Sequence, residues 1–289
     1  MSGASTVATD NVTPARDRIG SEQVLAALAG VSRGRVYDLG TELSAEMPHG
    51  PRDTFAAFQL TPYRTPRCLC DPGYAGHDFS MEVIMGAPHL GSHIDGFAHI
   101  QENGRIFGNV AAVDAFDDFG WKQHGMETVP PIVTRGVLID VPRSLGLEKL
   151  PDDFEIKAAH IEQCLNAEGI EVKVGDVVLV RTGKMLDYHN DPANYFVAHA
   201  GVGVEAALAL YDKGMAVLGT DTTATEPFPL QDETHTTHRA MLVQRGVHLL
   251  EILDLEELSA DRVYTFLFVC LPLKIVGATG SWVRPIAVA

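Results

Sequence analysis

The stretch DVVLVRTG, residues 176–183, is the clearest sign of the fold in this sequence. Its apolar residues form a short continuous run between an aspartate and a glycine, which is typical of a buried strand. Runs of the same kind recur at residues 35–40, 79–87, 135–141, 215–221, 247–253 and 263–270. We therefore expect a sheet whose strands are largely buried.

Two longer helices are expected among these strands. They cover residues 157–169 and 203–214, and each ends at a glycine. A shorter helix is expected at residues 21–30, with Ser21 as its N-cap. Strands and helices mix without strict alternation, which predicts an α/β architecture with a barrel or a mixed sheet.

The composition restricts the class of protein. No repeat or linker interrupts residues 21–289, so we expect one domain preceded by a disordered arm at residues 1–20. A formal net charge of −16 disfavours nucleic acid and anionic membranes as partners. The N-terminus has no apolar stretch of the kind found in signal peptides, so we expect a cytoplasmic protein. The pair Cys68 and Cys70 is interpreted as two incidental thiols.

A second stretch, HLGSHIDGFAH at residues 89–99, places three histidines and one aspartate close together. In an extended strand, His93 and Asp95 point to the same face. The glycines of the stretch allow turns that bring His89 and His99 towards the same point. Imidazole and carboxylate groups are ligands for Zn²⁺ or Mn²⁺. The stretch predicts a metal site, and a loop with surface histidines is the alternative.

A site of three protein ligands leaves one coordination position open for water, as in catalytic metal sites. The metal would lower the pKa of this water and generate hydroxide near neutral pH. His99 lies four residues beyond the aspartate, and the ordinary titration range of imidazole suits a general acid/base.

Residues 89–99 resemble the H-x-G-T-H-x-D-x-P-x-H signature of the cyclase family of metal-dependent hydrolases. This family includes kynurenine formamidases, isatin hydrolases, imidases and trans-dienelactone hydrolases. The resemblance extends from about residue 35 to the C-terminus. Further segments that carry it are VYDLGTELSAEMP (36–48), RGVLIDV (135–141), HRAMLVQRGVHLLEIL (238–253) and LPLKIVGATGSWVRPIAV (271–288).

The resemblance implies a swivelling β/β/α barrel, a small-molecule substrate, and assembly as a homodimer or homotetramer. The metal ligands that it implies are His89, His93, Asp95, His238 and Glu251, with His99 as the catalytic acid/base. The implied activity is hydrolysis of a small cyclic or N-acyl amide or imide by a metal-bound hydroxide. One or two Zn²⁺ or Mn²⁺ ions per chain would take part. Lactone hydrolysis and a metal-dependent lyase or cyclase reaction are the alternatives.

Several departures from the family pattern bear on the pocket. Ser92 replaces the usual threonine and keeps its hydroxyl. Phe97 replaces a proline, and we expect its ring to reshape the pocket. Gly50 stands where the formamidases carry a substrate-stacking tryptophan. The spacing from His238 to Glu251 is one residue longer than in those formamidases.

Four further polar residues have less specific interpretations. His235 is interpreted as a solvated neighbour of the predicted ligand three residues later, and His248 as a core histidine with satisfied hydrogen bonds. His199 either borders the pocket or is structural. Asp221 heads a loop that follows a strand, where it either binds a ligand or caps a helix.

Overall fold

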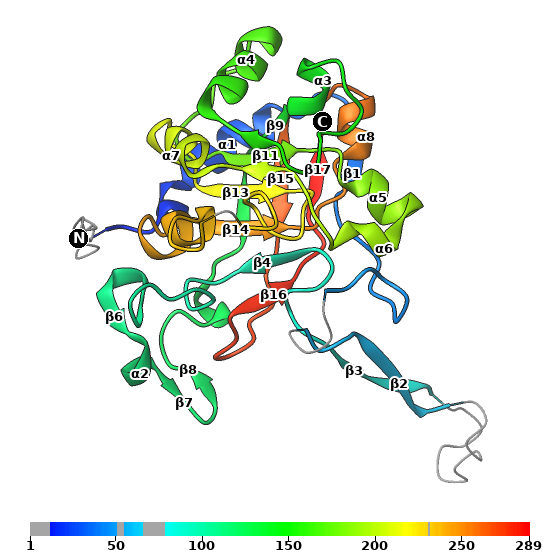
Figure 1. Cartoon of the computed structure of the whole chain (residues 1–289), viewed down its shortest axis with the longest axis vertical. Coiled ribbons are helices and arrows are strands. Elements are labelled where there is room, and N and C mark those ends of the chain that lie inside the picture. Colours follow the sequence, from blue (N-terminus) through cyan, green and yellow to red (C-terminus); the bar gives the residue numbers. More distant parts are fainter. Residues whose placement is uncertain (1–11, 51–54, 66–78, 231) are drawn as a thin grey trace.

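The computed structural model of the protein describes residues 12–50, 55–65, 79–230 and 232–289. Within these residues, the centre of the molecule is one large curled sheet of nine strands (Figure 1). In spatial order they are β1 (Val36–Asp38), β17 (Ile286–Val288), β15 (Thr265–Cys270), β9 (Ile132–Asp140), β11 (Val177–Arg181), β13 (Val217–Thr220), β14 (His248–Glu251), β4 (His93–Asp95) and β16 (Gly280–Trp282).

Strands β9, β11, β13 and β14 run parallel, and the outer strands pair antiparallel with their neighbours. The mixed α/β class predicted from the sequence is therefore confirmed.

The helices are α1 (Ser21–Ala29), α2 (Ala112–Ala115), α3 (Val141–Ser144), α4 (Ala158–Glu168), α5 (Met185–Asn190), α6 (Pro192–Tyr195), α7 (Val204–Asp212) and α8 (Glu256–Ala260), with the 3-10 helices η1 (Ala15–Arg18), η3 (Phe107–Asn109) and η4 (Met126–Thr128) and the π-helix η5 (Arg239–Val243). Small ribbons are formed by β2 (Gln59–Arg64) with β3 (Met81–Met85), β5 (Arg105–Ile106) with β6 (Val110–Ala111), β7 (Phe116–Asp117) with β8 (Gly120–Trp121), and β10 (Glu155–Ile156) with β12 (Gly201–Val202).

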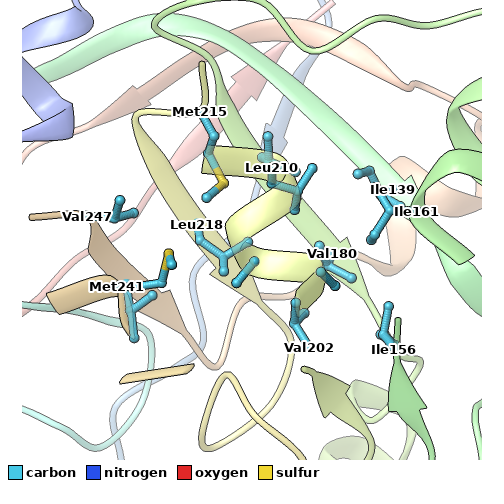
Figure 2. Packing of buried hydrophobic residues seen from close by; sticks show 14 of the residues in the cluster. Ile139, Ile156, Ile161, Val180, Val202, Leu210, Met215, Leu218, Met241 and Val247 are labelled. Atoms are coloured by element: carbon cyan, nitrogen blue, oxygen red, sulfur yellow. The ribbon is translucent and has the colours of Figure 1, made fainter. Parts of the chain in front are cut away.

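Both faces of the central strands are covered. On β11, Val178 and Val180 belong to the apolar cluster that includes Ile161 of α4, and Figure 2 shows part of this cluster. Val177 and Leu179 belong to the cluster on the opposite face. Because consecutive residues of a strand point to opposite faces, a strand buried on both sides must be apolar throughout. This explains the continuous run at residues 176–183.

The ends of the helices follow local rules with one correction. Gly169 ends α4 with a φ of 63°, a left-handed conformation that favours glycine. Helix α1 begins at Ser21, and its N-cap is Gly20. The prediction that Ser21 is the N-cap is therefore wrong by one residue. Of the predicted arm at residues 1–20, residues 1–11 lie outside the described residues. The following segment includes η1, in which Ala15 is fully buried.

The strand predicted at residues 79–87 exists, but it is not buried. Among the described strands, β3 pairs only with β2, and the two form a ribbon that projects from the body (Figure 1). Val83, Ile84 and Met85 keep 56%, 53% and 56% exposure. The apolar residues therefore predicted this strand correctly, but they did not predict whether another element covers it.

Cys68 and Cys70 lie outside the described residues, whereas Cys164 and Cys270 are buried free thiols. A search of the described segments finds no helix with the length and apolar character needed to cross a membrane.

Candidate metal centre

Strand β4 presents His93 and Asp95 on one face of the large sheet. Ile94 between them is buried in the core of the opposite face. His93 pairs across the ladder with Glu251 of β14, and His93 Nε2 lies 3.5 Å from Glu251 Oε2. The same Nε2 atom lies 3.5 Å from Asp95 Oδ1. Side chains alternate between the two faces of this three-residue strand. His93 and Asp95, two residues apart in sequence, therefore lie on the same face, as predicted.

His89 reaches Asp95 from the turn before β4. Gly91 in this turn has a φ of 64°, which favours glycine. His89 Nδ1 lies 2.7 Å from Asp95 Oδ1, and His89 Nε2 lies 2.9 Å from Thr279 Oγ1. The ring of His99 stacks on the ring of His89 with a centroid distance of 3.9 Å and an interplanar angle of 22°. The three histidines and the aspartate of the 89–99 stretch therefore gather at one point.

His238 and Glu251 join this point from distant parts of the chain. His238 directly precedes the π-helix η5, and Glu251 is the last residue of β14. His238 Nε2 lies 3.5 Å from Asp95 Oδ2 and 3.3 Å from Glu251 Oε1. The carboxylates of Asp95 and Glu251 consequently lie between the imidazoles of His93 and His238. The longer spacing between His238 and Glu251 has not separated them.

Two residues of the centre were missed by sequence reasoning. Glu226 Oε2 lies 2.6 Å from His238 Nδ1, and the Thr225 hydroxyl donates to Glu251 Oε1 at 2.9 Å. Both follow β13 in the loop that begins at Asp221, and a single glutamate among threonines was the only signal. Glu226 also lines a cavity of about 790 Å³. Glu226 therefore both lines this cavity and contacts the His238 ring.

The ionisable side chains of the centre strongly affect one another's pKa values. Burial favours a raised pKa for Asp95, but His99, His238 and His89 outweigh it and lower this pKa well below its ordinary value. Burial acts to lower the pKa of His238, but Glu226 and Glu251 outweigh it and raise the pKa well above 6.5. The hydrogen bond with Glu251 and the charge of Asp95 likewise outweigh burial and raise the pKa of His93. The carboxylates thus require positive charge beside them.

The donor set fits a divalent metal ion. Ligand atoms of His93, Asp95 and Glu251 lie within 4.8 Å of one another, and so do those of His89, Asp95 and His99. Asp95 belongs to both groups, and its buried Oδ2 atom has no hydrogen-bond partner among the residues that the structure describes. His93 and His238 each hold Nδ1 against an acceptor, Gly91 O and Glu226 Oε2, so Nε2 faces the carboxylates. Histidine ligands of metals are usually oriented in this way.

His99 differs electrostatically from its neighbours. Burial lowers the pKa of His99 to about 3, and the charge of Asp95 opposes this shift only partly. A neutral imidazole can accept a proton at physiological pH. His99 is therefore neutral at physiological pH, but a pKa near 3 lies below the ordinary imidazole range expected from the sequence and makes it a weaker base than an unperturbed histidine.

The other polar residues singled out in the sequence have structural contacts. His248 is 1% exposed and has hydrogen-bond partners at both ring nitrogens, which confirms its interpretation as a core histidine. Burial lowers the pKa of His248 to about 3. Asp221 accepts hydrogen bonds from Thr182 and from the Gly183 backbone amide, so it ties β11 to β13. His199 is fully buried against Thr223, whereas His235 is exposed.

The expectation that the Phe97 ring reshapes the pocket is wrong. Phe97 does not shape a pocket, because its ring is buried in the core and stacks on His248 at 4.0 Å. At Gly50, a Cβ atom would lie 2.8 Å from the Phe55 ring and 3.3 Å from the Phe196 ring, so these two rings lie close to the backbone at this position.

Comparisons with known proteins indicate which family and which fold the chain resembles. The model of the Cyclase family matches residues 37–227. A kynurenine formamidase of Delftia acidovorans is 25% identical, over 87% of this chain and 96% of that protein. A crystal structure described as a novel cyclase superposes with a TM-score of 0.88 at 25% identity, over 97% of both chains. Isatin hydrolase A of Labrenzia aggregata, solved with benzyl benzoate, has the same fold with a TM-score of 0.65 at 22% identity, over 92% of this chain and 97% of that one.

Proposed function

Because the chain belongs to the Cyclase family, we propose that it is a metal-dependent hydrolase that opens a small cyclic or N-acyl amide or imide. The observation that carries this proposal is the buried Asp95 carboxylate, which lies among imidazoles with one oxygen that accepts no hydrogen bond from the described residues. The names of the relatives support the amide C–N bond as the target, since one is a kynurenine formamidase and another an isatin hydrolase.

The ligands that would hold the metal are His89, His93, Asp95, His238 and Glu251, with Zn²⁺ or Mn²⁺ as the ion. Asp95 lies close to both histidine groups, which supports its sharing by two ions. A bound ion of this type lowers the pKa of a coordinated water and polarises a carbonyl oxygen of the substrate.

The protein's own contribution to proton transfer comes from His99. Its neutral imidazole accepts a proton from the attacking water and delivers it to the leaving nitrogen as the C–N bond breaks. Stacking on His89 holds the His99 ring beside the ligand cluster. The Nδ1 atom of His93 is hydrogen-bonded to Gly91 O, and that of His238 to Glu226 Oε2. These hydrogen bonds keep the Nε2 atoms of both rings directed at the carboxylates.

The deciding experiment combines a substrate panel with metal content. Isatin, a cyclic imide, N-formylkynurenine and a dienelactone are followed by ring-opening or deformylation absorbance, with and without a chelator. We expect turnover of an amide or imide that chelation abolishes and Zn²⁺ or Mn²⁺ recovers. Turnover of the dienelactone alone would move the assignment to a lactone hydrolase. Activity in fully metal-free protein would refute the proposal.

Two variants separate the roles of the histidines. His93→Ala should lose both metal and activity. His99→Ala should keep the metal and lose turnover on the order of 10²–10⁴-fold. Loss of metal from His99→Ala would instead make His99 a ligand, which its proximity to His89 and Asp95 also allows.

We also propose that the chain forms a homodimer or homotetramer and that the large sheet belongs to a swivelling β/β/α barrel. The exposed ribbon of β2 and β3 supports assembly, because a two-stranded ribbon alone is marginally stable in water. Its exposed apolar residues are Leu60, Tyr63, Met81, Val83, Ile84 and Met85. Light scattering after size exclusion tests this proposal, and Val83→Lys should shift the mass towards the monomer.

A further inference from the structure

The metal centre has a neighbour that no catalytic role explains, the side chain of Arg16. Arg16 belongs to η1, near the N-terminus, and its Nη1 atom lies 3.2 Å from His248 Nε2. His248 Nδ1 lies 2.8 Å from the carbonyl oxygen of Asp95. A continuous path of two hydrogen bonds therefore joins the N-terminal segment to the backbone of the central ligand.

The chemistry of the two side chains fixes the direction of these hydrogen bonds. A guanidinium group has donors and no acceptor, so Arg16 must donate and His248 Nε2 must accept. A neutral imidazole with an accepting Nε2 carries its proton on Nδ1. His248 Nδ1–H then donates to Asp95 O. Arg16 thereby selects the one neutral tautomer of His248 that can hold the Asp95 backbone.

Packing holds both members of this path in place. The ring of Phe97 stacks on the ring of His248 at a centroid distance of 4.0 Å and an interplanar angle of 7°. The Arg16 guanidinium carbon lies 5.4 Å from the centroid of the same Phe97 ring. His248 thus contacts both the backbone of Asp95 and the ring of Phe97, and Arg16 lies over the same ring.

Helix η1 is itself fixed to the body. Ala15 is fully buried, and its backbone amide donates to Gly246 O at 2.8 Å. Arg18 donates to the carbonyl oxygens of Tyr211 and Met215 at 2.9 and 2.7 Å. Arg18 therefore anchors the helix, whereas Arg16 is the member that reaches towards the metal centre.

We propose that Arg16 is a positioning residue that acts through His248 to hold Asp95 for metal binding. This inference rests on the proposed metal site. It assigns a role to a segment that lies outside residues 37–227, the part matched by the family model. Outer partners of metal ligands matter because ligand orientation sets affinity.

The first test measures Zn²⁺ affinity by competition with a chromophoric chelator, using the full chain stripped of metal. Arg16→Met keeps the aliphatic stem and removes the donors, and we expect affinity to fall about 10-fold. Arg16→Lys keeps a donor and should bind within about 3-fold of the wild type. Arg18→Met is the matched control, since it loosens the same helix without touching His248, and it should bind as the wild type does.

The second test observes the tautomer directly in metal-free protein. Long-range ¹H–¹⁵N spectra of histidine-labelled protein report which ring nitrogen carries the proton, and His248→Gln assigns the signal. We expect Nδ1–H in the wild type and a shift towards Nε2–H in Arg16→Met.

The outcomes are distinguishable. Nε2–H in the wild type overturns the inference, and so does an equal effect, or no effect, of Arg16→Met and Arg18→Met on Zn²⁺ affinity. A wild-type protein that binds neither Zn²⁺ nor Mn²⁺ refutes the proposed function. In that case, an Nδ1–H signal lost in Arg16→Met still supports the hydrogen-bonded path.

Discussion

The imidazole of His89 lies directly against the backbone of Gly280. A Cβ atom at Gly280 would come within 2.5 Å of His89 Cε1 and within 3.0 Å of both ring nitrogens. The register of β16 on β4 explains this approach, because Gly280 pairs with Asp95. With His99 stacked on it as well, the His89 ring has little freedom to move.

Gly280→Ala should therefore act on the metal centre. The added methyl group must displace His89 from Asp95, and we expect metal affinity to fall about 10–100-fold. Titration of the stripped protein with Zn²⁺ measures this loss. Gly30→Ala is the control, since its Cβ would approach no atom closer than 3.4 Å. Unchanged affinity in Gly280→Ala would show that His89 is not a ligand.

Glu226→Gln tests the partner of His238. The carboxylate of Glu226 can only accept, so it holds the proton on His238 Nδ1 and leaves Nε2 free for a metal. Glutamine keeps the shape but removes the charge, and we expect Zn²⁺ affinity to fall about 10-fold. Glu155→Gln changes another carboxylate of the same cavity, which should not affect binding. An equal loss in both variants would indicate a general effect of charge.

The sequence predicted the parts of the fold that depend on local pattern. Continuous apolar runs located β9, β11, β13, β14 and β15, because strands buried on both faces have no polar side. A run at residues 79–87 looked the same but forms an exposed ribbon. Strand propensity is a property of the segment, whereas burial depends on which distant segment covers it.

The residues of the candidate site also fall into those that local sequence predicts and those that depend on distant contacts. Residues 89–99 fold locally, so their spacing was enough to predict that His89, His93 and Asp95 converge. Glu226 joins through a contact with His238 in another loop, and neither its type nor its surroundings distinguished it from a surface glutamate. Arg16 was assigned to a disordered arm, although it contacts a histidine 232 positions later. Such contacts exist only after the sheet has formed.

Metal binding should release protons. In the metal-free protein, acidic neighbours outweigh burial and raise the pKa values of His93 and His238, so both imidazoles hold protons around pH 6.5. Their contribution to stability is present below pH 6.5 and is lost as the pH rises through the raised values. Ligand nitrogens must lose these protons, so apparent Zn²⁺ affinity should increase with pH.

Isothermal titration in two buffers of different ionisation enthalpy counts these protons. We expect about one to two protons released per chain near pH 6.5, and fewer at higher pH. A wild-type protein that binds Zn²⁺ with no proton release at any pH would contradict the ligand roles of His93 and His238.

A different histidine should make the protein sensitive to acid. Burial lowers the pKa of His199 to about 4, although its hydrogen bond to Ala200 O acts in the opposite direction. Between pH 6.5 and 4 the unfolded chain binds a proton that the folded chain excludes, so stability falls as the pH falls. His199 alone should contribute about 2 kcal/mol to the change in stability from pH 7.5 to pH 5.0. Urea unfolding at the two pH values should show the same change in stability in the wild type and in His235→Gln, which changes an exposed histidine. His199→Gln should lose about 2 kcal/mol less over the same interval, and equal pH dependence in all three proteins would exclude His199 as the source.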